Sequence, residues 1–215
     1  DIFSINELKE LEIPIIEDLA HCTGGAINGK KLGSHGDIAM TSFGDRKFLD
    51  GGFGGAVFTN DETLAEKIQL FLSPSSHHYK INFSYQIPNI IAAIIYEKSF
   101  LLDNQIDKRK QIAQRYLEEL KDLVDIRYDG VNSSFYHRFM LDIKGSKKQF
   151  IDHMFSNGII CGVGIDNPLH IMYGKQLHLP NTDFASKQSI ALPIRPNLSD
   201  TEVDFIIKSA KSLLI

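Results

Sequence analysis

The sequence predicts an α/β fold, in which short buried strands alternate with turns and are followed by helices. Three short apolar runs occupy the first third of the chain, and each is bounded by Gly, Asp or Asn, as buried strands usually are. From Asp61 onward the spacing of apolar residues becomes helical. Apolar residues make up 43% of the 215-residue chain and charged residues 23%, so an ordinary globular core is expected.

The first third is expected to form part of a sheet. A glycine-rich stretch over residues 24–36 has no helical period and separates the first two apolar runs, so we expect a loop or a hairpin there. The three expected strands cover residues 13–16, which lead into Glu17-Asp18, residues 38–43 and residues 55–59.

Helices are expected in the middle of the chain. Asp61 offers a cap and begins an acidic first turn for a helix over residues 61–72. Pro88 can begin a long helix, because a proline at the first helical position loses no intrahelical hydrogen bond. We expect that helix to end near residue 104 and another to cover residues 106–123, with its charged face in solvent.

A second region is expected after residue 124, with shorter strands and two further helices. We place the domain boundary so that residues 1–104 and 105–215 form separate domains. Ser199 and Glu202 form a capping box of the form Ser-x-x-Glu, which opens a final helix to residue 214. The other elements expected here are strands over residues 135–143 and 159–163 and a helix over residues 147–157, which Gly158 ends.

Composition and charge exclude several classes of function. The formal net charge is −4, from 23 basic and 27 acidic residues, so we expect no nucleic-acid partner. No apolar run approaches the roughly 20 residues that span a bilayer, so no membrane association is expected. Cys22 and Cys161 have no metal or redox spacing, which indicates a reducing, cytoplasmic setting. Adjacent residues seldom converge on one ion, so we expect His77-His78 to lie in a loop and no metal to bind.

Polar and glycine residues follow the expected strands in an informative order. Asp18 ends the first apolar run, and Ser42 and Lys47 follow the second. A glycine cluster, Gly51-Gly52-Phe53-Gly54-Gly55, comes next. In α/β proteins the ends of strands are where ligands bind. We therefore expect these residues to form one site.

Pyridoxal 5′-phosphate (PLP) chemistry needs this set of residues. A lysine must bind the cofactor covalently and later act as a base. A carboxylate must pair with the pyridine nitrogen, and hydroxyl and N–H groups must hold the phosphate. Glycines let the backbone approach the cofactor. The sequence thus predicts that Lys47 carries PLP.

Each of these residues also has a structural interpretation. Lys47 could be a solvated surface charge, and Asp18 could cap a helix that starts at Leu19. Glu17 is an alternative to Asp18, although neighbours in an extended segment face opposite ways. Ser42 could simply end a strand, and His21 could have a structural role. The combination of residues favours the cofactor site.

Six segments in order resemble the DegT/DnrJ/EryC1/StrS family of PLP-dependent sugar aminotransferases. They are IPIIEDLAH, GKKLGSHGDIAMTSF, SFGDRKFLDGGFGGAVFTND, HRFMLDI, GIICGVGIDNPLH and LPIRPNLSDTEVDFII. The resemblance implies the type I, aspartate aminotransferase-like fold of PLP-dependent transferases. Residues 1–104 would then be part of the PLP-binding large-domain sheet. Residues 105–215 would be a linking helix and a small α+β C-terminal domain.

The resemblance also implies a role for each site residue. Lys47 would form the Schiff base and move the proton, and Asp18 would pair with the pyridine nitrogen. Ser42 would contact the phosphate, and His21 would lie near the ring and its 3′-oxygen. Ser84 would reach the cofactor of the partner subunit, and His170 would face the sugar.

The sequence departs from the family pattern in two ways. The family has a comparable stretch ahead of the Asp18 strand, which supplies the rest of the sheet, a phosphate loop and a stacking aromatic residue. We expect that part to come from a separate chain, to have been lost, or to lie upstream, and its absence here to leave a bare strand edge and an exposed apolar face. In addition, Gln86 and Phe53 stand where the family usually has arginine and glutamate, so one phosphate contact loses its charge.

The function expected is that of an aminotransferase that moves an amino group from an amino acid, by resemblance glutamate, to a keto-sugar nucleotide. Such enzymes build surface polysaccharides or glycans and are homodimers. The alternative is a catalytically impaired partial paralogue that acts as a regulatory or assembly subunit. A dehydratase is disfavoured, because in those relatives histidine replaces the lysine at the position of Lys47.

Overall fold

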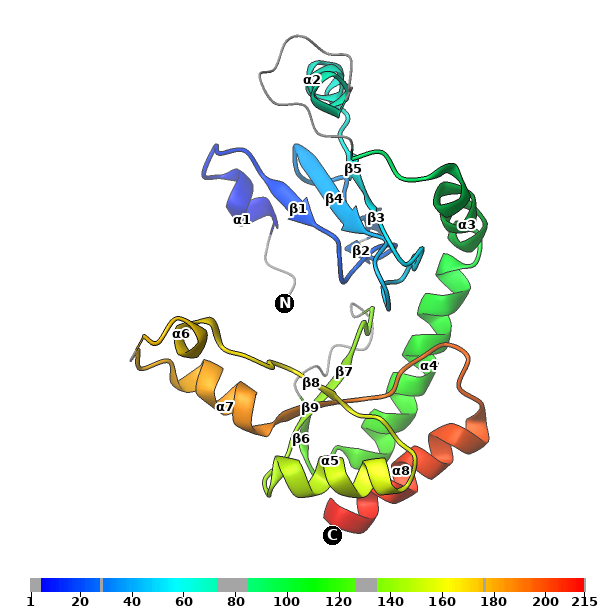
Figure 1. Ribbon diagram of the computed structural model, residues 1–215, viewed down its shortest axis with the longest axis vertical. Coiled ribbons are helices and arrows are strands. Elements are labelled where there is room, and N and C mark those ends of the chain that lie inside the picture. Colours follow the sequence, from blue (N-terminus) through cyan, green and yellow to red (C-terminus); the bar gives the residue numbers. More distant parts are fainter. Residues whose placement is uncertain (1–4, 28, 73–84, 127–134, 176, 215) are drawn as a thin grey trace. The chain divides into compact units, whose positions relative to one another are not determined.

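The computed structural model describes residues 5–27, 29–72, 85–126, 135–175 and 177–214 (Figure 1). The chain divides into two compact units, Asp1–Gln105 and Ile106–Ile215, which we call unit 1 and unit 2. Each unit contains a sheet and helices, so the expected mixture of α and β structure is confirmed.

A three-stranded sheet forms the centre of unit 1 (Figure 1). The strands are β1 (Ile16–Asp18), β4 (Ile38–Ser42) and β5 (Gly55–Phe58), in the order β1-β4-β5. Strands β1 and β4 are parallel and β5 is antiparallel to β4. The two strands expected over residues 38–43 and 55–59 are therefore confirmed.

Strand β1 lies further along the chain than expected, because its start is set by β4. Pro14 has no N–H to donate. The side chain of Asp37 accepts the N–H of Ile15 at 2.7 Å, and the N–H of Asp37 donates to the carbonyl of Ile15 at 2.9 Å. The ladder then begins at Ile16, opposite Ile38. The prediction of residues 13–16 was wrong by this shift, and Glu17 and Asp18 lie inside the strand.

A hairpin and a short helix flank β1 in the sequence. The glycine-rich stretch contains an antiparallel hairpin of β2 (Ala26–Ile27) and β3 (Lys30–Lys31), which confirms the expected loop or hairpin. A short helix, α1 (Ile5–Lys9), precedes β1 and was not expected from the sequence.

Three helices follow β5, and the sequence placed the first more accurately than the other two. Helix α2 (Glu62–Leu72) begins as expected, with the side chain of Asp61 accepting the N–H of Leu64 at 3.0 Å. Helix α3 (Asn89–Ser99) ends about five residues earlier than expected, and α4 (Leu102–Leu120) follows at once. The hydroxyl of Ser99 donates to the carbonyl of Tyr96 at 2.7 Å, and such side-chain bonding competes with helix continuation.

The buried core of unit 1 is small in the described residues. Phe43, Leu49 and Ile95 form its buried centre. Large apolar side chains on one face of the sheet remain exposed, including Ile16 at 65%, Met40 at 43% and Val57 at 51%. Strand β1 and strand β5 are the two edges of the described sheet. Both features agree with the bare edge and exposed apolar face that the sequence led us to expect.

Unit 2 contains a four-stranded antiparallel sheet in the order β6-β7-β9-β8. Strand β9 is central and all of its residues are buried, yet it was not expected from the sequence. The strands are β6 (Asp125–Ile126), β7 (Phe139–Asp142), β8 (Gly162–Val163) and β9 (Ser189–Leu192).

Strands β7 and β8 are shorter than expected for local reasons. Tyr136 has a positive φ of 46°, so the extended backbone of β7 starts only after it. The N–H of Ile159 donates to the carbonyl of Met154 at 2.9 Å and so belongs to the end of the preceding helix rather than to β8.

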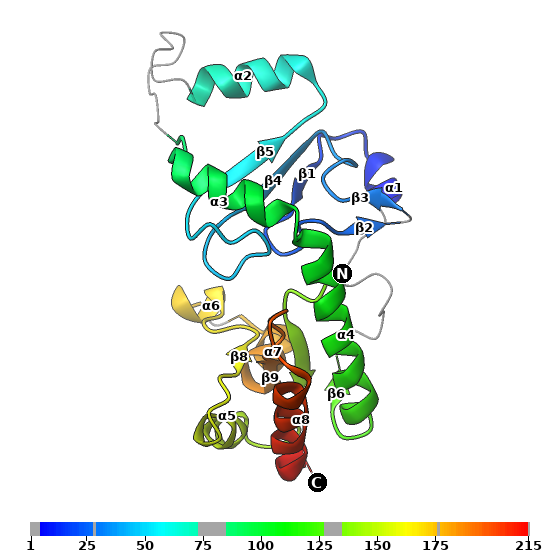
Figure 2. The same cartoon turned by 90° about the vertical axis from the view of Figure 1, so that its right-hand side faces the viewer.

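Helix α4 and two later helices of unit 2 pack with its sheet in one hydrophobic core (Figure 2). Helices α5 (Lys147–Ser156) and α8 (Asp200–Leu214) were both expected, and Gly158 with φ 74° follows the first. The capping box of α8 forms as expected. Helices α6 (Leu169–Met172) and α7 (Pro180–Gln188) were not expected from the sequence. The core includes Tyr116, Phe139, Phe150, Leu141, Ile190 and Val203. In the part of the chain that the structure describes, no helix has the length and apolar character to cross a bilayer.

Candidate functional site

Asp18 and Ser42 lie on the same face of the unit 1 sheet. Asp18 is opposite Met40 in the parallel pairing of β1 and β4, and Ser42 lies two residues beyond Met40. Partners in register share a face, and so do alternate residues of one strand. Both side chains therefore lie at the carboxyl ends of parallel strands, on the exposed face that carries Met40.

Glu17 faces the other side of the sheet and has a structural role. It is only 8% exposed, and its carboxylate accepts three backbone N–H groups, from Gly33 at 2.8 Å, His35 at 2.7 Å and Gly36 at 2.6 Å. Burial by itself raises the pKa of Glu17, but these hydrogen bonds outweigh it and hold the pKa below its usual value. Its carboxylate is thus engaged by the loop that follows β3, which leaves Asp18 as the exposed acid of β1.

Asp18 organises the turn after β1 with one carboxylate oxygen. Oδ1 accepts the N–H of Ala20 at 2.9 Å, and within the described residues Oδ2 has no hydrogen-bond donor. Residues 20–24 form turns, so the alternative in which Asp18 caps a helix was wrong. The thiol of Cys22 donates to the carbonyl of Asp18 at 3.6 Å, and burial followed by the charges of Asp18 and Glu17 raises the pKa of that thiol.

Ser42 is half-buried, and its hydroxyl proton is not used in a hydrogen bond to any described residue. Its Oγ accepts the N–H of Gly44 at 3.2 Å. Since that bond uses the oxygen as acceptor, the O–H can still donate to an anionic oxygen.

Lys47 lies in the turn between β4 and β5, and the chain on both sides of it is fixed. Its backbone N–H donates to the carbonyl of Gly44 at 3.2 Å. The next two side chains, Phe48 and Leu49, are 3% and 9% exposed. The side chain of Lys47 is half-buried, and among the described residues its ammonium has no hydrogen-bond or ion-pair partner. Lys47 therefore combines an anchored backbone with an uncommitted amine.

The structure places the remaining predicted residues more loosely. His21 is exposed, in the turn after β1. His170 belongs to unit 2, where its Nε2 lies 3.2 Å from Oδ1 of Asp183 and its side chain is 7% exposed. Ser84 and His77-His78 lie outside the described residues. Asp18, Ser42, Lys47 and His21 thus belong to one unit, and their roles remain predictions.

The two residues that replace a usual family residue, Phe53 and Gln86, are both at the surface of unit 1. Phe53 is 65% exposed, and Gln86 is exposed as well. Asp50 was not predicted as a functional residue, yet its carboxylate accepts two backbone N–H groups of the Lys47 turn. The run Asp50-Gly51-Gly52 was the available signal, because Asp before glycine often forms side-chain-stabilised turns.

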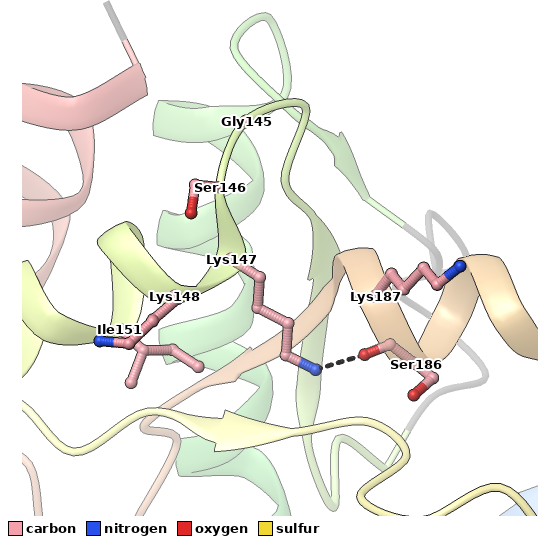
Figure 3. Close-up of a pocket in the computed structure, with 7 residues that line it drawn as sticks. All are labelled: Gly145, Ser146, Lys147, Lys148, Ile151, Ser186 and Lys187. Atoms are coloured by element: carbon pink, nitrogen blue, oxygen red, sulfur yellow. Dashed lines mark hydrogen bonds between the residues drawn. The ribbon is translucent and has the colours of Figure 1, made fainter. Parts of the chain in front are cut away.

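A surface pocket of about 500 Å³ in unit 2 is lined by none of the predicted site residues (Figure 3). Lys147 donates from Nζ to the carbonyl of Ser186 at 2.7 Å, and burial lowers the pKa of Lys147. Lys148 pairs with Asp152 at 2.5 Å. These bonds engage two of the three lysines that line the pocket. Among the described residues, His, Cys, Asp and Glu form no group that could hold a metal.

Comparison with known proteins gives a consistent result. A model of the DegT/DnrJ/EryC1/StrS aminotransferase family matches residues 1–211. The dTDP-3-amino-3,6-dideoxy-α-D-galactopyranose transaminase of Aneurinibacillus thermoaerophilus is 30% identical, over 97% of this chain and 61% of its own length. GDP-perosamine synthase of Escherichia coli O157:H7 is 29% identical, over 97% of this chain and 61% of its own.

Solved structures agree with the sequence matches. A DegT DnrJ EryC1 StrS aminotransferase from Brucella abortus superposes with a TM-score of 0.87 at 28% identity, over 99% of this chain and 61% of that one. The fold is the type I fold of PLP-dependent transferases, as the resemblance implied. This chain spans about 61% of the length of these proteins.

Proposed function

Because the chain belongs to the DegT/DnrJ/EryC1/StrS aminotransferase family, we propose that it supplies the lysine-bearing part of a PLP-dependent sugar aminotransferase. The observation that carries the proposal is the arrangement of unit 1. Asp18 and Ser42 share one face at the ends of parallel strands, and the uncommitted amine of Lys47 follows in the next turn.

The chemistry of these side chains fits the cofactor that this family uses. When bound, PLP supplies an aldehyde that takes up amines and a ring that withdraws electrons from the carbon being deprotonated. Lys47 would hold it covalently through Nζ. Oδ2 of Asp18 would accept a hydrogen bond from the N–H of the protonated pyridine ring, and the hydroxyl of Ser42 would donate to the phosphate.

Lys47 would also move protons once an amino substrate has displaced it. A lysine released as a free amine is a base, and it can return the same proton to a neighbouring atom. The anchored backbone around Lys47 keeps the amine close to the reacting carbon, and such positioning contributes much of the rate in enzymes. His21, exposed in the turn beside Asp18, would lie near the 3′-oxygen of the cofactor.

The proposed substrates are an amino acid, by resemblance glutamate, and a keto-sugar linked to a nucleotide. The names of the two relatives above support this class, one being a dTDP-sugar transaminase and the other GDP-perosamine synthase. His170 would face the sugar. Surface polysaccharide or glycan biosynthesis in the cytoplasm is the setting we propose.

The active enzyme is proposed to be a homodimer that includes the rest of the family's length. Ser84 would contribute to the cofactor site of the partner subunit. The exposed β1 edge and the apolar face with Ile16, Met40 and Val57 support the need for further sheet strands.

Replacement of Lys47 by alanine tests the proposal in the full-length protein. The wild-type protein should show the visible absorbance of lysine-bound PLP, which glutamate should change. Borohydride added in the absence of glutamate should attach the cofactor permanently to the peptide that contains Lys47. Lys47→Ala should lose both signals, whereas Lys67→Ala, which removes an exposed lysine of α2, should keep both. Retention of the absorbance and of the attached cofactor in Lys47→Ala would contradict the assignment.

The second candidate function is that of an impaired paralogue that serves a complete relative as a regulatory or assembly subunit. Phe53 and Gln86, which replace a family glutamate and arginine, favour it, because the charge of the arginine helps to neutralise phosphate. A wild-type protein that binds no cofactor and does not react with any amino acid would support this alternative. A glutamate-dependent change of absorbance would exclude it.

A further inference from the structure

The turn that carries Lys47 is held by the side chain of Asp50. Oδ2 of Asp50 accepts the N–H of Arg46 at 3.2 Å, and Oδ1 accepts the N–H of Gly52 at 2.8 Å. One bond thus reaches the residue before Lys47 and the other reaches Gly52, which precedes strand β5. The carboxylate closes the turn around Lys47.

The hydrogen bond to the N–H of Arg46 supports a backbone conformation that is unfavourable for this residue. Arg46 has a φ of 65°, in the left-handed region that residues with a Cβ seldom adopt. That conformation sets the direction of the chain at the next residue, which is Lys47. A charged acceptor on the N–H of Arg46 stabilises a conformation that the residue would otherwise leave.

Asp50 can act as a fixed point because its own backbone is anchored. The ammonium of Lys98, on α3, donates to the carbonyl of Asp50. The next residue, Gly51, packs so closely on α3 that a Cβ there would lie 3.0 Å from Cδ1 of Ile95. On the other side, the buried Leu49 joins the core of unit 1. The carboxylate therefore transmits the position of α3 to the Lys47 turn.

We propose that Asp50 is a positioning residue for Lys47, which it serves by fixing the left-handed turn at Arg46. The inference rests on the proposed function of Lys47, since it concerns the placement of that amine. Asp50 is assigned no contact with the cofactor or the substrate.

Asp45 provides a matched control within the same turn. Its side chain is 73% exposed and pairs with Nε of Arg46 at 3.0 Å, a side-chain contact that holds no backbone group. Substitution of Asp45 removes the same charge from the same loop. An effect of Asp50 that arises only from charge should therefore appear at Asp45 as well.

The first measurement is hydrogen exchange in the full-length protein without cofactor. The amides of Arg46 and Gly52 should be protected in the wild type and in Asp45→Asn. In Asp50→Ala both should exchange about tenfold faster or more, since their acceptor is gone. Asp50→Asn should release one of the two, because its amide group has one acceptor oxygen where the carboxylate has two.

The second measurement is the rate at which added PLP becomes attached to Lys47, trapped with borohydride and followed by mass spectrometry of the Lys47 peptide. Misplacement of a reacting group by about 1 Å can slow a reaction on the order of 100-fold. We expect Asp50→Ala to be slower by about 10- to 100-fold and Asp50→Asn to lie between it and the wild type. Asp45→Ala and Asp45→Asn should stay within about twofold of the wild type.

The outcomes separate this inference from the proposed function. If the wild type attaches PLP at Lys47 and the Asp50 variants do so at the same rate, Asp50 is not a positioning residue, whatever its effect on hydrogen exchange. If Asp50→Ala does not fold, Asp50→Asn decides in the same way. If the wild type attaches no PLP at Lys47, the proposed function fails and this inference fails with it.

Discussion

The carboxylate of Glu17 can be removed with almost no change of shape by a glutamine substitution. In the structure Oε1 accepts from His35 and Gly36, and Oε2 accepts from Gly33. The glutamine oxygen can keep the two bonds of Oε1. Its NH₂ group then faces the N–H of Gly33, so two donors meet and one hydrogen bond is lost.

The expected loss of stability follows from these contacts. A hydrogen bond to a charged group contributes about 1.5–3 kcal/mol, and an unsatisfied donor costs about 1–3 kcal/mol. For Glu17→Gln we therefore expect the free energy of unfolding to fall by about 1–3 kcal/mol. Glu17→Ala removes all three bonds. We expect a loss of about 3–5 kcal/mol, less than three times a single bond, because the loop amides are only partly buried and water can reach them.

The pH dependence of stability provides a second, independent test of the role of Glu17. The pKa of Glu17 in the folded protein is lowered from 4.5, because the three N–H donors outweigh the effect of burial. A lowered folded-state pKa means that the stabilisation is fully present above pH 4.5 and is lost as the pH falls through the folded-state value. Glu17→Gln should lack this part of the acid sensitivity.

Urea unfolding at neutral and at acidic pH measures both effects. Far-UV circular dichroism is a suitable signal, since the chain has no tryptophan. Glu66→Gln is the control, because Glu66 is an exposed acid of α2. The reasoning would be refuted if Glu17→Gln unfolded within about 0.5 kcal/mol of the wild type at neutral pH, as ordinary surface substitutions do. It would also be refuted if the wild type and Glu17→Gln lost the same amount of stability in acid.

Three further predictions concern unit 2. Burial raises the pKa of Cys161 to about 11, so at pH 8 about one thiol in a thousand is ionised, and a thiol reagent should label it far more slowly in the native protein than in urea. Ser199→Ala should destabilise the protein by about 1 kcal/mol in urea unfolding, because Ser199 caps α8 together with Glu202. The loss should be smaller in acid, since the hydrogen bonds of Ser199 lower the pKa of Glu202. Tyr116→Phe removes a 2.7 Å hydrogen bond to the carbonyl of Pro193 and should lower the thermal midpoint, with a loss of about 1–2 kcal/mol; an unchanged midpoint would contradict this.

Features that depend on residues within a few positions of one another could be predicted from the sequence. Asp61 caps α2, Ser199 and Glu202 form the capping box of α8, and Gly158 follows the end of α5. These contacts close over three or four residues, so their geometry is almost complete in the local sequence. Alternation along an extended segment likewise predicted that Glu17 and Asp18 face opposite ways, and the burial pattern of β1 confirms it.

Strand limits and strand order depended on partners distant in the chain. Pairing with Ile38 and the bonds of Asp37 determine that β1 begins at Ile16. Strand β9 is central because β7 and β8, which come much earlier in the sequence, pair with its two edges. No local pattern carries that information, because the pairing energy arises between strands rather than within them.

The sequence by itself determined which residue types could form a cofactor site, namely Lys47, Asp18 and Ser42 in order along expected strands. The tertiary structure decided which of the two neighbouring acids is available. Glu17 is engaged by a loop that begins 16 residues later, and that contact leaves Asp18 on the exposed face with Ser42. The tertiary structure also revealed the contacts of Asp50, because a carboxylate that holds two backbone amides of a turn can be recognised only once the turn has closed.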